Sequence, residues 1–238
     1  MRKDLRAADQ LRPVTFELGF TKFAEGSCLV RAGDTVVLCN ASVEERVPLH
    51  VSSGGWVTAE YSMLPRANRE RSKRDVSKLK LSPRSAEIQR LIGRSLRAVV
   101  DLKALGVRTI TIDCDVLQGD GGTRTASVTG GFIALVLACR KLKEKGLLTR
   151  MPIINYVAGI SAGIVDSEAI LDLCYEEDSR AMVDLNCVMN GNGNLIEIQG
   201  TGEGRPFTVE EEAKLLRLCR KGCMELIQME KDILGDLG

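Results

Sequence analysis

Residues 107–142, VRTITIDCDVLQGDGGTRTASVTGGFIALVLACRKL, decide the fold class because they join a strand to a buried helix. Residues 107–117 alternate apolar and polar side chains, which is the period of a strand with one buried face. The glycine-rich run Gly119-Asp120-Gly121-Gly122 ends that strand. Residues 123–142 are apolar on most sides, which predicts a helix at the centre of the protein.

Around this unit the chain predicts further strands and two more helices. Short β-branched or alternating runs between glycine-containing turns predict strands at 14–20, 27–31, 35–43, 56–62, 153–165, 169–175, 181–189 and 195–199. Ser82 and Pro83 are typical of a helix start, and apolar residues at helical spacing extend that helix over 83–103. Thr208 and Glu211 form a capping box before a C-terminal helix. The prediction is an α+β fold: a single domain over residues 1–238 with two pseudo-symmetric βα halves and mixed sheets flanked by helices.

Composition places the chain among ordinary globular proteins. Of its 238 residues, 44% are hydrophobic and 27% charged, which excludes disorder and a disulfide-dominated miniprotein. Eight cysteines without a CxxC pair and a single histidine provide no zinc framework, so we expect reduced core thiols. Neither a signal peptide nor a membrane-spanning stretch is expected, so the predicted location is the cytoplasm, with no membrane partner.

The net charge is +1, but basic and acidic residues are concentrated in different segments of the chain. Residues 66–97 hold eleven basic and three acidic residues, whereas residues 166–238 hold sixteen acidic and seven basic ones. Residues 66–80 lack apolar periodicity, so we expect an exposed, mobile loop that contacts a polyanion. Since no aromatic residues interleave the basic ones, contact with backbone phosphates is favoured over base stacking. The alternative is a solvated loop without a ligand. The candidate contact residues are Arg66, Arg69, Arg71 and Arg74.

The turn before the central helix has the composition of an anion site. Glycine allows close approach of the backbone, helix N-terminal amides donate hydrogen bonds, and Thr123 and Arg124 add directed donors beside Gly122. The segment lacks both the GK[ST] and the GxGxxG patterns, so phosphate is favoured over a nucleotide cofactor. A tight turn with a capping threonine is the alternative.

Two aspartates six residues apart, Asp178 and Asp184, are the candidate metal ligands. Because Asp184 lies between apolar strand residues, its burial calls for a cation or donors, and two carboxylates suit Mg²⁺ completed by waters and a substrate phosphate. The alternative is a turn acid together with an aspartate exposed on a one-sided sheet. His50 beside Pro48 is predicted to be a loop residue, and no nucleophile has a partner base, so covalent catalysis is not indicated.

A further set of segments, in order along the chain, is Arg6-Ala7-Ala8-Asp9-Gln10-Leu11-Arg12-Pro13, Thr58-Ala59-Glu60-Tyr61, Met63-Leu64-Pro65-Arg66, residues 87–97, Asp113-Cys114-Asp115-Val116, residues 120–127, Glu177-Asp178-Ser179 and Asp184-Leu185-Asn186. Together these segments resemble the ribonuclease PH family, phosphate-dependent 3′ exoribonucleases that trim tRNA precursors. They cover nearly the whole chain, and as a set they are far more specific than any single motif.

The resemblance implies a domain of the ribonuclease PH type that assembles as a homo-hexamer, a trimer of dimers. It implies phosphate binding at Arg84 and at Gly122, Thr123 and Arg124, with Asp178 and Asp184 as metal-binding and catalytic residues. The expected co-substrate is inorganic phosphate, the expected metal is Mg²⁺ or Mn²⁺, and the expected substrate is RNA, especially tRNA precursor 3′ ends. The released products would be nucleoside diphosphates, and nucleotide addition would be the reverse reaction.

Two departures from the family pattern are visible. Phe23 stands where members often have histidine, and Ser82-Pro83 stands where they often have Gly-Gly or Ser-Gly. The alternative function is a catalytically silent RNA-binding ring subunit of an exosome-like core, which typically lacks the phosphate arginine or the acidic pair. A hydrolytic nuclease that uses the same carboxylates, and releases monophosphates, is a third option.

Overall fold

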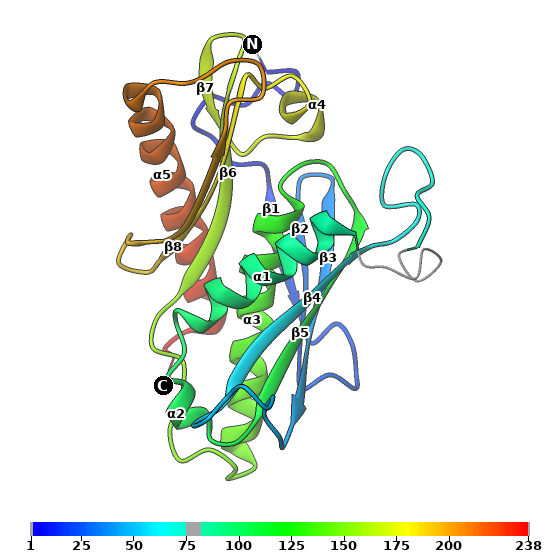
Figure 1. Cartoon of the computed structure of the whole chain (residues 1–238), viewed down its shortest axis with the longest axis vertical. Coiled ribbons are helices and arrows are strands. Elements are labelled where there is room, and N and C mark those ends of the chain that lie inside the picture. The colour runs from blue at the N-terminus through cyan, green and yellow to red at the C-terminus, as the bar shows by residue number, and fades with distance from the viewer. Residues whose placement is uncertain (1, 75–81, 238) are drawn as a thin grey trace.

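The protein consists of two β-sheets and their covering helices, and the computed structural model describes residues 2–74 and 82–237 (Figure 1). The strands are β1 (Val14–Leu18), β2 (Gly26–Ala32), β3 (Thr35–Glu44), β4 (Trp56–Met63), β5 (Thr109–Gln118), β6 (Val157–Val165), β7 (Glu168–Leu171), β8 (Val183–Asn190) and β9 (Leu195–Thr201). The helices are α1 (Pro83–Arg97), α2 (Leu102–Leu105), α3 (Thr123–Glu144), α4 (Tyr175–Asp178) and α5 (Val209–Leu234).

The two sheets differ in how their strands pair. The first sheet has the order β1-β2-β3-β5-β4, in which β4 runs parallel to β5 and the other pairs are antiparallel. The second has the order β7-β6-β8-β9 and is antiparallel throughout. The expected mixed pairing is therefore confined to the first sheet, where α1 provides the crossover that parallel strands need.

The sheets and helices form layers (Figure 1). Helices α1 and α3 lie between the two sheets, and α5 covers the opposite face of the second sheet. Strand β6 is buried along its whole length because α3 and α5 cover its two faces. Strand β5 alternates buried and half-buried residues because only one of its faces is covered. Each half of the chain thus ends in a long helix that packs on its own sheet, in agreement with the predicted βα halves.

Helix α3 is long and apolar enough to cross a membrane by length and composition alone. However, 83% of its apolar window is buried inside the protein, where it packs against strands of both sheets. It is therefore the central core helix that the sequence predicts.

Several local predictions are confirmed. The Ser82 hydroxyl accepts from the Ser85 amide at 3.0 Å and caps α1. The Thr208 and Glu211 capping box starts α5 through bonds of 3.2 and 2.9 Å. All eight cysteines are free thiols; seven are buried as expected, whereas Cys174 is half-buried.

Three predicted elements differ from the observed ones by four residues or more at one end. The strand predicted over 153–165 begins at Val157. The helix predicted over 83–103 ends at Arg97, because Val100 makes a bridge to Ile153 and Asp101 caps the separate helix α2. The strand predicted over 169–175 ends at Leu171. Asp172 then adopts a left-handed conformation, with φ of 55°, and the chain turns into α4.

Candidate active site

The turn before α3 exposes helix amides. Gly121 and Gly122 have φ of 77° and 63°, a region that glycine occupies without strain. Gly122 is the N-cap residue of α3, and no side chain caps this helix start. The first amides of α3 therefore lack an intrahelical partner, as at every helix start, and they carry the positive end of the helix dipole. A helix start of this kind can bind an anion, so the anion site stays a prediction that this geometry allows.

The candidate phosphate residues from α1 and α3 converge beside this turn. The Thr123 hydroxyl lies 2.8 Å from the hydroxyl of buried Tyr61. Burial raises the pKa of Tyr61, while Thr123 and the nearby guanidinium groups of Arg84 and Arg124 lower it. Both arginines therefore lie close enough to act on one phenol. Within the described part of the chain the Arg84 guanidinium makes no hydrogen bond or ion pair, so its donors are available to a ligand.

Arg124 is tied to two neighbouring elements by polar contacts that a ligand would have to displace. Its Nη1 donates to Gln199 Oε1 of β9 at 2.9 Å and to Glu87 Oε1 of α1 at 3.5 Å. Gln199 Nε2 also donates to Glu87 Oε1 at 2.8 Å. No local sequence pattern marks Glu87 or Gln199 as part of the site, because these contacts join three separate elements.

Asp178 and Asp184 lie together at the same place. Burial and then the nearby Asp178 carboxylate raise the pKa of Asp184 to about 6, against the smaller effects of Arg124 and of the Asn186 side chain. Asn186 Nδ2 donates to Asp184 Oδ2 at 3.0 Å. Asp178 still touches solvent, but neighbouring protein atoms remove part of its hydration and raise its pKa, whereas Arg84 and Arg124 lower it. The four charged residues therefore form one cluster.

The carboxylate pair fits a magnesium ion in chemistry and in number of ligands. Mg²⁺ is commonly held by one or two carboxylates, with waters and substrate phosphates in the remaining positions. Two carboxylates that repel each other, in a partly desolvated place, are stabilised by a shared cation. No group of three or more His, Cys, Asp or Glu residues suited to a metal occurs in residues 2–74 and 82–237.

The basic loop is only partly associated with this cluster. Arg66, Arg69, Arg71 and Arg74 are all exposed and lie outside helices and strands. Arg69 approaches the site, since its guanidinium lies 6.0 Å from the ring centroid of Tyr175 on α4. Among the described residues, no hydrogen bond, ion pair or ring contact joins the other three arginines to the cluster. Residues 75–80 of the predicted loop lie outside the described residues.

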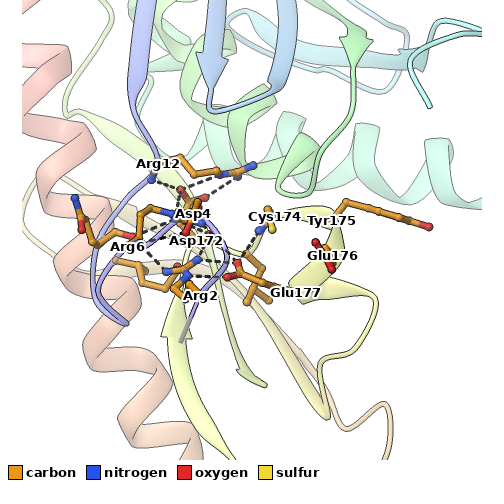
Figure 2. Close-up of polar contacts among 12 residues, drawn as sticks. Arg2, Asp4, Arg6, Arg12, Asp172, Cys174, Tyr175, Glu176 and Glu177 are labelled. Carbon is orange, nitrogen blue, oxygen red and sulfur yellow. Dashed lines mark hydrogen bonds and ion pairs between the residues drawn. The ribbon is translucent and has the colours of Figure 1, made fainter. Parts of the chain in front are cut away.

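A second polar cluster lies next to α4, the short helix that ends at Asp178 (Figure 2). Arg2, Arg6 and Arg12 of the N-terminal segment meet buried Asp172 and Glu177, and several hydrogen bonds join them. Glu177 immediately precedes Asp178, so this cluster reaches α4 (Tyr175–Asp178), which we call the acidic turn. The segment Arg6-Ala7-Ala8-Asp9-Gln10-Leu11-Arg12-Pro13 belongs to the family resemblance, but its sequence alone indicates no role, because its partners lie far away along the chain.

Comparison with known proteins gives consistent matches over nearly the whole chain. Residues 10–141 match the model for domain 1 of the 3′ exoribonuclease family, and residues 155–222 match the model for domain 2. The chain is 56% identical over 239 residues to the ribonuclease PH of Bacillus subtilis and 55% identical to that of Bacillus velezensis, covering 99% of this chain and 98% of each relative.

A solved structure shows the same fold at lower identity. The Archaeoglobus fulgidus exosome with RNA bound to the active site is matched with a TM-score of 0.83 and 23% identity, over 96% of this chain and 92% of the other.

Proposed function

Because the chain belongs to the 3′ exoribonuclease family and resembles ribonuclease PH over its full length, we propose that it shortens RNA from the 3′ end by phosphorolysis. It transfers the terminal nucleotide to inorganic phosphate and releases a nucleoside diphosphate. Its substrate class is the 3′ end of tRNA precursors, and it can add nucleotides in the reverse direction, since a phosphodiester is exchanged for a phosphoanhydride of comparable energy.

In this mechanism the protein selects phosphate over water as the nucleophile. Arg84, Thr123, Arg124 and the first amides of α3 hold inorganic phosphate in line with the last phosphodiester of the RNA. Such positioning can lower the activation barrier for attack by phosphate by roughly 7 to 11 kcal/mol. This outweighs the high concentration of the competing nucleophile water, about 55 M. An oxygen of the bound phosphate attacks the terminal phosphorus, the bond to the 3′ oxygen breaks, and that oxygen takes up a proton. No covalent enzyme intermediate is needed.

Asp178 and Asp184 would hold the metal ion, Mg²⁺ or Mn²⁺. When bound there, the ion would neutralise the charge that develops on the phosphoryl oxygens. Asn186 orients the Asp184 carboxylate through its 3.0 Å hydrogen bond. Asp184, in its partly desolvated place, is also the candidate for moving the proton.

The observation that supports this function most directly is the meeting of two arginines, an uncapped helix start and two aspartates in one place. The test is to incubate RNA carrying a 3′ extension with Mg²⁺, with and without phosphate, and to identify the mononucleotide released. We expect phosphate-dependent shortening with nucleoside diphosphate as product. Monophosphate products would indicate a hydrolytic nuclease, and RNA binding without turnover would indicate a silent ring subunit. The retained arginines and acids disfavour the latter.

The assembly, the location and the RNA path belong to the same proposal. The chain forms a cytoplasmic homo-hexamer, a trimer of dimers, and the exposed arginines at 66, 69, 71 and 74 contact RNA phosphates. We also propose that the chain folds as a single unit, and the packing of α3 against strands of both sheets supports this. Light scattering measures the assembly, and a single calorimetric transition is expected for one folding unit.

A further inference from the structure

We propose that four buried residues outside the site, Arg2, Arg12, Asp172 and Glu177, act as positioning residues. They hold the phosphate-binding turn, residues 119–122 before α3, and the acidic turn at a defined separation. We call these four residues the arginine clamp (Figure 2). The inference rests on the proposed function, because it assigns a role to residues that touch neither phosphate nor RNA.

Arg12 joins the two turns directly. Its Nη2 and Nε donate to the two carboxylate oxygens of Asp172 at 2.7 and 3.1 Å, and its amide donates to Asp172 Oδ2 at 2.8 Å. Its Nη1 donates to the carbonyl oxygen of Asp120 at 2.6 Å, which is the residue before the two glycines of the phosphate-binding turn. One guanidinium therefore contacts both the segment leading to α4 and the turn that starts α3.

The phosphate-binding turn contacts residues 173–175, which lead into the acidic turn, and it also contacts Arg12. A Cβ on Gly121 would lie 2.3 Å from the Leu173 carbonyl oxygen, and a Cβ on Gly122 would lie 3.0 Å from Arg12 Nη2. The Tyr175 amide donates to Asp120 Oδ1 at 3.3 Å. Because these groups are closely packed, a movement of Arg12 would displace the glycines that shape the anion site.

Arg2 holds the acidic turn from the other side. Its Nε and Nη2 donate to the two oxygens of Glu177, each at 2.7 Å, and it also donates to the carbonyl oxygens of Leu171 and Asp172 at 2.8 and 2.9 Å. Glu177 Oε2 accepts from the Cys174 amide at 3.1 Å and so closes the single turn of α4. Since α4 has only four residues, these bonds and not helix propensity determine where Asp178 points.

The chemistry of the clamp indicates positioning more than anchoring. Buried ion pairs give little net stability compared with apolar packing, because both charges lose their hydration. An N-terminal segment that only needed attachment could use apolar contacts. Forked guanidinium groups that bind carboxylates and backbone carbonyls together define geometry in a way that apolar contacts do not.

The test perturbs each end of the clamp separately. Arg12→Lys keeps the charge but loses the fork, so the glycine turn shifts, and we expect about a tenfold or larger rise in KM for phosphate with a smaller change in kcat. Glu177→Gln keeps the size but loses the charged pair with Arg2, so Asp178 shifts. We expect about a tenfold or larger fall in kcat with little change in KM for phosphate.

The matched control is Lys221→Ala. It removes the ion pair between Lys221 Nζ and Asp9 Oδ2, 2.6 Å apart, which ties the same N-terminal segment to α5 away from the site. We expect wild-type kcat and KM for this variant. All variants are assayed well below their melting temperatures, and rates are referred to the folded fraction.

The outcomes separate the clamp from the function itself. If the wild type needs no phosphate, the proposed function fails before the variants are compared. If the wild type is phosphate-dependent but both variants show lower melting temperatures with unchanged kcat and KM, the clamp is only an anchor and the inference is overturned. If Arg12→Lys or Glu177→Gln does not fold, Asp172→Asn and Arg2→Lys test the same two ends with milder changes.

Discussion

Replacing Arg124 by glutamine tests the phosphate site most directly. In the proposed complex Arg124 donates two charge-assisted hydrogen bonds to phosphate, each contributing about 1.5 to 3 kcal/mol. Phosphate binding displaces the contacts of Arg124 with Gln199 at 2.9 Å and with half-exposed Glu87 at 3.5 Å. Losing these two contacts reduces the gain in binding free energy by about 1 to 2 kcal/mol. Substitution should therefore weaken phosphate binding by about 1 to 5 kcal/mol, which corresponds to a roughly 5- to 4,000-fold rise in KM for phosphate.

The assay measures initial rates of RNA shortening over a series of phosphate concentrations, with the RNA concentration fixed above its own KM. The matched control is Arg94→Gln on α1, which removes the same charge and breaks an exposed ion pair with Glu197 on β9, 2.8 Å apart. Because Arg94 is outside the cluster, its KM for phosphate should equal that of the wild type. An unchanged KM in the Arg124 variant, or an equal rise in the Arg94 variant, would refute the reasoning.

Three further predictions address charge, burial and RNA binding. Burial and Asp178 raise the pKa of Asp184 to about 6, and only the ionised carboxylate binds Mg²⁺. The Mg²⁺ concentration that gives half the maximal rate should therefore increase as pH falls through about 6. A concentration that does not change with pH would contradict this. Glu230 is fully buried, neither of its carboxylate oxygens has a hydrogen-bond partner among the described residues, and burial raises its pKa. Glu230→Met should stabilise the protein by about 1 to 3 kcal/mol in denaturant titrations. Because the folded-state pKa is raised, wild-type stability falls as pH rises above the ordinary glutamate value, so the gain should grow with pH; a gain that shrinks as pH rises would contradict this. Replacing the four loop arginines by serine should reduce the salt dependence of RNA affinity, and an unchanged slope would show that the loop does not contact phosphates.

Local patterns predicted the elements whose conformation depends on neighbouring residues. The alternation in β5, the apolar run of α3 and the caps at Ser82 and Thr208 each depend on residues within one or two turns, and the structure has all of them. The same reasoning was wrong for the strand predicted over 169–175, because Asp172 takes its left-handed conformation among partners from the N-terminal segment.

The sequence by itself determined the fold class, the family and which acids and arginines to examine, since these depend on local periodicity and on motifs read along the chain. Tertiary structure alone decided which of them meet. Arg2 and Glu177 are 175 positions apart, and Gln199 and Glu87 are 112 apart. No local preference encodes such pairs, because their distance is set by how two sheets and their helices pack together.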